Sequence, residues 1–374
     1  MRIGIDASDW LNQRGLGRYV RCLTEQLALN SELAVTLFSP EDLSGRVSFN
    51  CDLRSDARRL PWYSWRLPRL ARKHPVDVMF FPTNHAWWFG PAPSVVTIHD
   101  LACLHFPDKI FQSRREARYE AMRLRWFARH AAQISCVSEF TKADIVAKLG
   151  CSPNKISVVP SAVTDVFWRP PALDAAEVRD KFGLGARPFL LYTGGLDFRK
   201  NVMALVKAFA LLVQRDYDHM LVLVGEYGSR RSYFPDVDGL VRELGLEEHV
   251  KRLSGVSDEE LRSLYSEAAL FVFPTLFEGF GLPPLEAMAC GTPVAASNAT
   301  SVPEVVGDAG EFFEPTDTHQ MFQAMRNVLD SAHRADELRL LGQKRARQFT
   351  FERTAEGVLS ILRAASNGSR YTRL

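Results

Sequence analysis

Two carboxylates flanking a glycine- and proline-rich turn are the residues best placed to do chemistry. The segment EGFGLPPLE runs from Glu278 to Glu286, directly after a strand predicted at 270–274. Pro283 and Pro284 suit the first turn of a helix, where free backbone N–H groups attract anions such as a diphosphate. Carboxylates serve poorly as phosphate ligands, but they accept hydrogen bonds from hydroxyl groups. The pattern therefore favours a ligand that carries both a diphosphate and hydroxyls.

Within this segment each position has an expected task. The glycines let the backbone approach a ligand closely, and the N–H groups near Gly281 and Leu282 would point at the anion. Glu286 is expected within the first turn of the helix, where the helix dipole alone could also account for a carboxylate. The ligand-binding candidates in the segment are Gly279, Phe280, Gly281, Leu282 and Glu286.

The longer string EGFGLPPLEAMACGTPV, which begins at Glu278, resembles the signature of retaining glycosyltransferases of family 4, also called glycosyl transferases group 1. The similarity extends over nearly the whole chain. It implies the GT-B fold, an α/β architecture of two facing Rossmann-like domains with doubly wound parallel sheets and a cleft between them. In that family the first glutamate binds hydroxyls of the donor sugar and the second binds the ribose. By resemblance these roles fall on Glu278, a candidate catalytic residue, and on Glu286.

A second set of residues follows the strand predicted at 188–193, in the sequence GGLDFRKN. Arg199 offers a planar fork of donors and Lys200 a point charge, and the two suit a diphosphate leaving group. A solvated basic helix start is the alternative, although cations there oppose the helix dipole. The family carries the same pair, so the resemblance implies that both are catalytic. Gly194 and Gly195 join the donor-binding candidates.

The first half of the sequence holds two further candidate sites, a glycine loop near the N-terminus and a histidine at a strand end. Gly15 and Gly17 form a short glycine loop that opens a helix. The loop lacks a third glycine, which disfavours dinucleotide binding. By resemblance it approaches the donor phosphates. His99 ends the strand predicted at 94–98, and the family places a histidine there against the donor sugar. We expect His99 to be catalytic and Asp100 to support its loop.

A third loop, after the strand predicted at 250–254, is expected to contact the base of a nucleotide through its backbone. Gly255 and Val256 are its candidates by resemblance. Asp236 and Asp238 form a D-x-D pattern, which binds a metal in another glycosyltransferase fold. Here the pattern precedes a helix, and we interpret it as a solvated face. With positive charge supplied by Arg199, we expect no metal and no cofactor beyond the nucleotide-sugar substrate.

Short β-branched runs alternate with amphipathic helical patterns, which predicts βαβ units and parallel sheets. Ligands of such sheets bind at the carboxyl ends of the strands, where every candidate above is located. The strands are expected at 2–6, 34–38, 78–82, 94–98, 133–137, 156–159, 188–193, 219–224, 250–254, 270–274 and 293–296.

The chain of 374 residues suits two domains. We expect an acceptor-binding domain at 1–170, a nucleotide-sugar-binding domain at 171–350, and a C-terminal helix at 351–374 that returns to the first domain. Helices are expected at 174–182, 318–331, 335–348 and 351–366, and the tail 367–374 is expected to be disordered.

Composition narrows the cellular setting. The chain has no apolar run long enough to span a bilayer, and Asp6 and Asp9 argue against a signal peptide. Its six cysteines show no pairing pattern, which predicts reduced thiols and a cytoplasmic location. Residues 1–170 carry 23 Lys and Arg against 16 Asp and Glu, a net +7, while the remainder carries 23 against 28, a net −5.

The positive charge gathers in two basic-aromatic stretches. Residues 54–73 hold seven basic residues with Trp62, Tyr63 and Trp65, and residues 111–130 hold six arginines among aromatics. Such stretches are compatible with an anionic membrane surface, with nucleic acid, or with an ordinary basic helix face. We favour peripheral contact with the inner face of a membrane and expect no nucleic acid.

Together the patterns predict a retaining hexosyltransferase that acts on a nucleotide sugar. The best donor by resemblance is GDP-mannose, because GLGRY and VTIHDLACLHFP resemble a subgroup that builds bacterial surface polysaccharide or O-antigen. The acceptor would be a glycan or a lipid-linked glycan. Rhamnosyl or glucosyl transfer is the near alternative. A sugar-nucleotide epimerase or a non-catalytic sugar-nucleotide-binding protein are alternatives of other classes.

Overall fold

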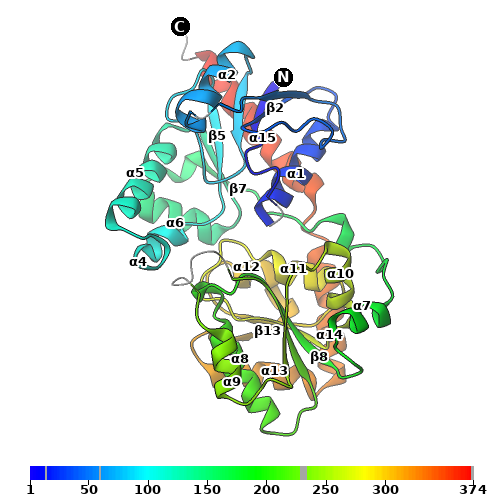
Figure 1. Cartoon of the computed structure of the whole chain (residues 1–374). Helices are drawn as coiled ribbons and strands as arrows, with labels where there is room; N and C mark the ends of the chain where they lie inside the picture. Colours follow the sequence, from blue (N-terminus) through cyan, green and yellow to red (C-terminus); the bar gives the residue numbers. More distant parts are fainter. Residues whose placement is uncertain (13–14, 59, 228–233, 372–374) are drawn as a thin grey trace. The chain divides into compact units, whose positions relative to one another are not determined.

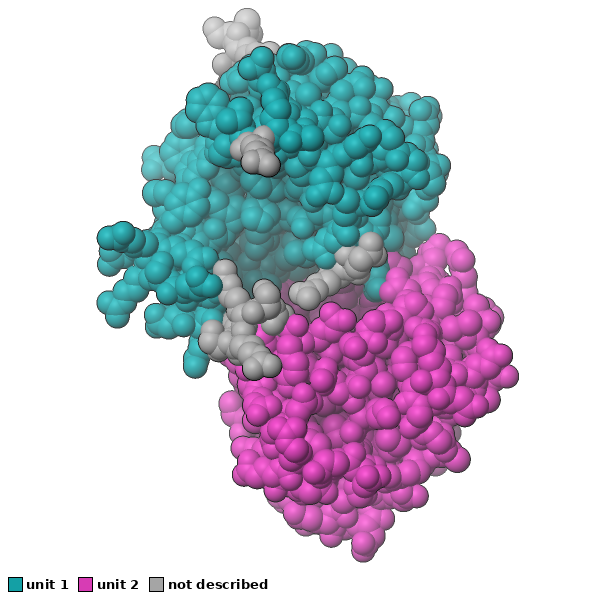
Figure 2. Space-filling view, viewed as in Figure 1, with its two compact units in different colours: residues 1–162, 350–374 teal, residues 163–349 magenta. Residues whose placement is uncertain are grey.

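The computed structural model describes residues 1–12, 15–58, 60–227 and 234–371 (Figure 1). The chain forms two compact units, drawn in different colours in Figure 2. Unit 1 comprises Met1–Ala162 and Thr350–Leu374, and unit 2 comprises Val163–Phe349. Each unit is an α/β domain built around its own parallel sheet, and each is described separately below.

The described residues of unit 1 form a sheet of seven parallel strands in the order β3-β2-β1-β4-β5-β6-β7. The order runs outward on both sides of β1, so the strand order reverses between β1 and β4. In doubly wound sheets a ligand binds at such a point. The strands are β1 (Arg2–Asp6), β2 (Ala34–Ser39), β3 (Asp52–Ser55), β4 (Val78–Phe81), β5 (Ser94–Ile98), β6 (Gln133–Cys136) and β7 (Ile156–Val158).

Helices cover both faces of this sheet because neighbouring strand residues point to opposite sides. Phe80 packs with residues of α1 and α15, whereas Met79 and Phe81 pack with residues of α2, α5 and α6. Ile5 of β1 is fully buried on the first face. The helices are α1 (Gly15–Ala28), α2 (Leu67–Lys73), α3 (Ala102–His105), α4 (Pro107–Ile110), α5 (Arg114–His130), α6 (Glu139–Leu149) and α15 (Phe351–Tyr371).

The described residues of unit 2 form a sheet of six parallel strands in the order β10-β9-β8-β11-β12-β13. Its central strands, β8 and β11, are buried along their whole length. The strands are β8 (Phe189–Thr193), β9 (Met220–Val224), β10 (Val250–Leu253), β11 (Leu270–Phe273), β12 (Val294–Ser297) and β13 (Gly310–Phe313). The helices are α7 (Ala175–Phe182), α8 (Val202–Val213), α9 (Val237–Glu243), α10 (Asp258–Glu267), α11 (Leu282–Ala289), α12 (Val302–Val306), α13 (Thr318–Leu329) and α14 (Ala332–Ala346).

The two-domain parallel α/β fold expected from the sequence is confirmed, but two strands went unpredicted. β3 reads Asp52-Leu-Arg-Ser and β13 reads Gly310-Glu-Phe-Phe, so neither is a continuous apolar run. Both are edge strands, which pair on one side only. An edge strand needs less burial than a central one, and its sequence therefore gives a weaker signal.

The unit boundary lies between Ala162 and Val163, eight residues before the position at 170 suggested by the sequence. The segment after Ala162 joins unit 2 because Phe167 is fully buried there, edge-on to Tyr265 with ring centroids 5.7 Å apart.

At the other end of unit 2 the chain re-enters unit 1 through α15, which packs on α1. Residues 367–371, expected to be disordered, continue that helix, and residues 372–374 lie outside the described part of the chain. Among the described helices, none has the length and apolar character needed to cross a bilayer.

Candidate functional site

The loops that follow β8, β10 and β11 gather at one edge of the unit 2 sheet, because parallel strands end on the same side. The loop after β8 carries the Gly194-Gly195 pair and the Arg199-Lys200 pair, and the loop after β11 carries Glu278 to Gly281. β8 and β11 are direct neighbours in the sheet. The topology therefore brings the two cations and the first glutamate to adjacent strand ends.

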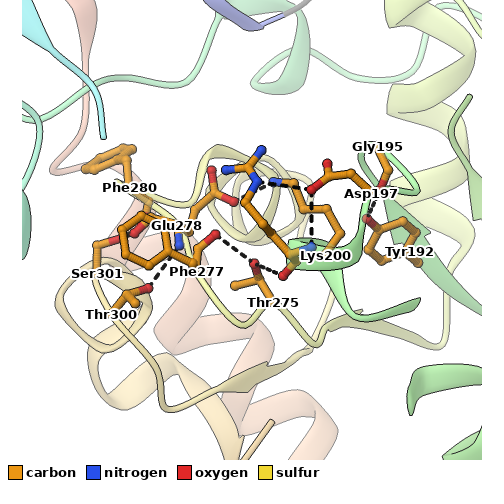
Figure 3. Close-up of polar contacts among 11 residues, drawn as sticks. Tyr192, Gly195, Asp197, Lys200, Thr275, Phe277, Glu278, Phe280, Thr300 and Ser301 are labelled. Atoms are coloured by element: carbon orange, nitrogen blue, oxygen red, sulfur yellow. Dashed lines mark hydrogen bonds and ion pairs between the residues drawn. The ribbon is translucent and has the colours of Figure 1, made fainter. Parts of the chain in front are cut away.

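Lys200 and Glu278 form a direct ion pair across these two loops (Figure 3). Their side chains are 12% and 20% exposed, so most of each charge is shielded from water. The Lys200 ammonium also lies 5.5 Å from the ring centroid of Phe273 on β11. Two residues that the sequence assigned to one ligand, 78 positions apart, thus meet in the structure.

Arg199 is held both by its own loop and by the loop after β11. Its Nε donates to Asp197 Oδ1 at 3.0 Å, and its carbonyl oxygen accepts the N–H of Leu276 at 2.7 Å and the hydroxyl of Thr275 at 3.1 Å. The sequence placed Arg199 and Lys200 at the opening of a helix. They lie instead in a short 3-10 turn, Phe198–Lys200, ahead of α8. This turn keeps the cations at the strand end and ties the β8 loop to the β11 loop.

The backbone around Glu278 is fixed from the far side by the turn after β12 (Figure 3). Its N–H donates to Thr300 Oγ1 at 3.1 Å. The fully buried Ser301 hydroxyl lies 2.9 Å from the Glu278 carbonyl oxygen and 2.8 Å from that of Phe280. Thr300 has a left-handed backbone, φ 54°, which a β-branched residue adopts only under strain. Strain of this kind persists where the surroundings hold a segment firmly in place.

The sequence predicts an anion site at the start of α11, and a helix does begin there, at Leu282. Gly281 precedes the helix with φ 121°, a conformation that favours glycine, and Pro283 and Pro284 fall in its first turn. At this helix start the N–H groups of Gly281 and Leu282 have no intrahelical acceptor, and these are the groups that the sequence assigns to an anion. Phe280 is buried against Phe349, with ring centroids 5.8 Å apart, and this contact anchors the loop between β11 and α11.

The expectation for Glu286 is wrong in one respect. α11 begins at Leu282, so Glu286 is its fifth residue and lies beyond the first turn. The helix dipole therefore does not explain this carboxylate, because the dipole acts within the first turn. Glu286 is 7% exposed and its Oε2 accepts the hydroxyl of Tyr265 at 3.1 Å.

The remaining residues of unit 2 that the sequence assigns to donor binding are distinguished mainly by their backbone conformation and contacts. The carbonyl oxygen of Gly195 accepts the hydroxyl of the buried Tyr192 at 2.6 Å, and Gly194 has φ 146°. Gly255 has φ 65° and no neighbouring atom within 4 Å of where a Cβ would stand, so its backbone conformation, rather than crowding, favours glycine. Val256 follows it and is half-buried.

The D-x-D pattern serves the fold. Asp236 caps α9 by accepting the N–H of Gly239 at 2.9 Å, and Asp238 pairs with Arg252 at 3.1 Å. Within the described ranges, His, Cys, Asp and Glu side chains form no group of three or more that could hold a metal ion.

In unit 1, His99 lies after β5 with its ring against Tyr19 of α1, at a centroid distance of 4.9 Å and nearly perpendicular. Its Nε2 is 2.8 Å from the Pro82 carbonyl oxygen. Burial lowers the pKa of His99, which keeps the ring neutral at pH 7. A neutral ring that donates through Nε2 presents Nδ1 as an acceptor. Asp100 supports the loop as expected, because its Oδ1 accepts the N–H of Ala102 at 2.9 Å.

The two glycines of the N-terminal loop differ. A Cβ on Gly17 would lie 1.9 Å from the carbonyl oxygen of Asn12, so packing within the loop already requires glycine. Gly15 is exposed at the first position of α1, and residues 13–14 before it are outside the described ranges.

The aromatic residues in the stretch 54–73, where the sequence favours membrane contact, are only partly exposed. Trp62 Nε1 and the Tyr63 hydroxyl donate to the two carboxylate oxygens of Asp6 at 3.0 and 3.1 Å. Asp6 is 1% exposed at the end of β1, and burial raises its pKa to about 6. Only Trp65 among these aromatics is largely exposed. A buried carboxylate needs hydrogen-bond donors, and this need draws the other two rings inward.

Four residues that shape the site had no local signal in the sequence. Thr275, Thr300 and Ser301 act through their hydroxyls on the backbones of Arg199 and Glu278, and Tyr265 contacts Glu286 from a different helix. Asp197 could have been found, because an aspartate two residues before the cations is a natural cap for the turn.

Comparison with known proteins identifies the family of the chain. Residues 174–347 match the family model described as glycosyl transferases group 1, and residues 13–165 match that of glycosyltransferase family 4. The chain is 32% identical to an MMP alpha-(1->4)-mannosyltransferase of Mycolicibacterium hassiacum, over 94% of this chain and 95% of that protein. The chain belongs to the family 4 glycosyltransferases.

A second relative and a solved structure extend the comparison. The O-antigen chain mannosyltransferase B of Escherichia coli is 29% identical over 90% of this chain and 93% of that protein. The crystal structure of Anabaena HepE in complex with UDP and glucose has the same fold, with a TM-score of 0.78 at 18% identity, over 97% of this chain and all of that one. The chain is thus a glycosyltransferase of the GT-B fold, a hexosyltransferase by its relatives.

Proposed function

We propose that this glycosyltransferase transfers mannose from GDP-mannose to a glycan or lipid-linked glycan acceptor during synthesis of a surface polysaccharide. The observation that carries the proposal is the Lys200–Glu278 ion pair beside the N-terminus of α11. A cation for a phosphate, a carboxylate for hydroxyls and free N–H groups for an anion together describe a sugar diphosphate. Both curated relatives named above are mannosyltransferases.

The site residues suggest how the donor is bound. The diphosphate accepts hydrogen bonds from the N–H groups at Gly281 and Leu282. It also replaces Glu278 as the ion-pair partner of Lys200. Glu278, released from its partner, accepts hydrogen bonds from hydroxyls of the donor sugar. Arg199 completes the positive charge around the diphosphate. Glu286 accepts from the ribose, and the backbone at Gly255 and Val256 contacts the base.

Charge then decides the chemistry. As the bond between sugar and diphosphate breaks, negative charge grows on the diphosphate, and Lys200 and Arg199 stabilise it. We propose that the sugar keeps its anomeric configuration, as the family does, and that the leaving diphosphate receives the proton of the acceptor hydroxyl. His99 Nδ1, an acceptor, suits a hydroxyl of the donor sugar. Because two cations neutralise the diphosphate, we propose that no metal is required.

A panel of labelled nucleotide sugars tests this function. The chain is incubated with GDP-mannose, UDP-glucose and a rhamnosyl donor, and slow release of free sugar is followed without acceptor. We expect release from GDP-mannose and little from the others. Release from UDP-glucose alone would replace mannose with glucose. Conversion to a different nucleotide sugar would instead support an epimerase, and tight binding without turnover a non-catalytic binding protein.

The outer face of α5 supports membrane contact. Arg118, Met122, Arg125 and Arg129 recur every three or four residues, so they share one face, and all are exposed. Tyr119, beside them, is 52% exposed. Phe89, which is 70% exposed, adds apolar area where it packs on Trp126 of the same helix. We propose that this basic-aromatic face lies on an anionic membrane, with the chain in the cytoplasm, where its six free thiols would stay reduced.

Co-sedimentation with anionic vesicles tests the membrane contact. The wild type should bind at low salt and less at high salt, because a surface attraction between charges is screened. Reversing Arg118, Arg125 and Arg129 to glutamate should abolish binding. The matched control reverses three exposed cations of unit 2, Lys207, Lys344 and Arg347. Failure of the wild type to bind at either salt concentration would sink this part of the proposal.

A further inference from the structure

Three buried polar side chains, those of Thr193, Tyr265 and Glu286, form a hydrogen-bonded series in unit 2, at the sheet edge where the strands end. Tyr265 of α10 is fully buried, and its hydroxyl lies 2.7 Å from Thr193 Oγ1 and 3.1 Å from Glu286 Oε2. Thr193 ends β8 immediately before the Gly194-Gly195 loop, and Glu286 lies on α11. The tyrosine therefore links the strand end next to the proposed diphosphate site with the carboxylate proposed to bind the ribose.

The chemistry of the three groups decides which of them donates each hydrogen bond and which accepts it. A carboxylate can only accept, so the Tyr265 hydroxyl donates to Glu286, and the Thr193 hydroxyl then donates to Tyr265. Burial raises the pKa of Tyr265 well above its usual value, and the negative charge of Glu286 adds to the effect. The tyrosine keeps its proton throughout the range in which an enzyme works, so the donated hydrogen bond is always present.

The ring of Tyr265 has little freedom to move. Phe167 and Phe271 meet it edge-on, with centroids 5.7 and 5.5 Å away. The hydroxyl of Thr292 donates to its carbonyl oxygen. Because the ring and the backbone are both held, the hydroxyl holds one carboxylate oxygen of Glu286 in a single orientation. A hydrogen bond to a buried charged group is among the stronger ones in proteins.

We propose that Tyr265 is a positioning residue that aims the Glu286 carboxylate at the ribose hydroxyls and so sets the preference for a ribonucleotide over a deoxyribonucleotide. The proposal rests on the function proposed above, in which Glu286 binds the ribose. Tyr265 itself touches no substrate. It acts through Glu286, and Thr193 acts through Tyr265.

Calorimetric titration of the full chain with nucleoside diphosphates tests this role. GDP and UDP are each compared with the 2′,3′-dideoxy analogue that lacks both ribose hydroxyls. For the nucleotide that the wild type binds, we expect a preference for the ribose form of about tenfold or more, the scale of a hydrogen bond to a charged group. Tyr265→Phe should reduce that preference to about twofold by weakening only the ribose form. Thr193→Val should reduce it in the same direction.

Tyr192→Phe is the matched control. Tyr192 is as deeply buried, and its hydroxyl donates to the Gly195 carbonyl oxygen rather than to a carboxylate. Its preference ratio should equal that of the wild type, even if its affinity for both nucleotides changes. If Tyr265→Phe fails to fold, Thr193→Val decides whether the series of hydrogen bonds sets the ribose preference. That variant removes only the Thr193 hydroxyl, which donates to Tyr265 and lies farthest from Glu286.

Two results would overturn the proposal. One is an equal loss of affinity for the ribose and dideoxy forms in Tyr265→Phe, which would make the tyrosine a purely structural residue. The other is an unchanged preference ratio in both Tyr265→Phe and Thr193→Val. A wild type that binds neither GDP nor UDP would refute the proposed function itself, and this inference with it.

Discussion

Breaking the Lys200–Glu278 pair should have separable effects on stability and on turnover. The two side chains are 12% and 20% exposed, so the discount for solvent screening is small. At an effective dielectric constant near 20, opposite charges about 4 Å apart attract by about 4 kcal/mol, and removing one partner from such a pair costs about 3 kcal/mol of stability. Lys200→Met or Glu278→Gln should each destabilise unit 2 by roughly that amount, because a shielded charge loses its partner.

The double variant separates the two roles. Lys200→Met with Glu278→Gln leaves no unpaired charge, so its free energy of unfolding should return to within about 1 kcal/mol of the wild type. Turnover should not return, because the diphosphate has lost its cation and the sugar hydroxyls have lost a charged acceptor, which the neutral amide of glutamine does not replace. We expect Lys200→Met alone to lower kcat by about 10²-fold, or about 2.7 kcal/mol of barrier, and the double variant to be at least as slow.

Denaturant unfolding and donor hydrolysis, measured on the same four proteins, provide the assay. The reasoning is refuted if the double variant regains turnover together with stability, because the pair would then be structural only. Near wild-type turnover in Lys200→Met would refute it equally, whatever the stability of that variant.

Three further predictions follow from other contacts. Burial raises the pKa of Asp6 from 3.8 to about 6, so its contribution to stability is complete below about pH 4 and is lost as the pH rises to about 6. Relative to wild type, Asp6→Asn should gain about 2.5 kcal/mol of unfolding free energy between pH 4 and pH 7, and a pH-independent difference in denaturant midpoints would contradict this. Thr300→Val removes the acceptor of the Glu278 N–H and should lower kcat about tenfold, whereas Thr300→Ser, which keeps the hydroxyl, should stay within about twofold; equal kcat values for the two would show that the hydroxyl is not needed. Turnover in excess EDTA should match that in buffer, and rescue of an inactive chelated enzyme by Mg²⁺ or Mn²⁺ would count against charge neutralisation by Lys200 and Arg199.

The sequence predicted the central strands well because they are buried on both faces and read as continuous apolar runs. The edge strands β3 and β13 were not predicted, because a strand that pairs on one side only does not need a continuous apolar run. The position of the candidate cations and of Glu278 was predictable because they lie in loops that follow strand ends, and parallel topology collects strand ends at one edge.

Contacts between distant side chains were not predictable in the same way. The pairing of Lys200 with Glu278 depends on β8 and β11 being neighbours, which no local pattern encodes. Thr300 lies 22 residues after Glu278, and its role depends on a strained backbone rather than on residue type. The contacts of Trp62 and Tyr63 with Asp6 were not predicted, because nothing in their own segment shows that the buried Asp6 needs hydrogen-bond donors.

A crystal structure of the chain with GDP-mannose would test the central claim most directly. The account predicts a diphosphate within hydrogen-bonding distance of Lys200, Arg199 and the N–H groups at Gly281 and Leu282. Glu278, freed from Lys200, should contact hydroxyls of the mannose. A nucleotide sugar bound away from the strand ends of unit 2, or one bound while Lys200 stays paired with Glu278, would contradict it.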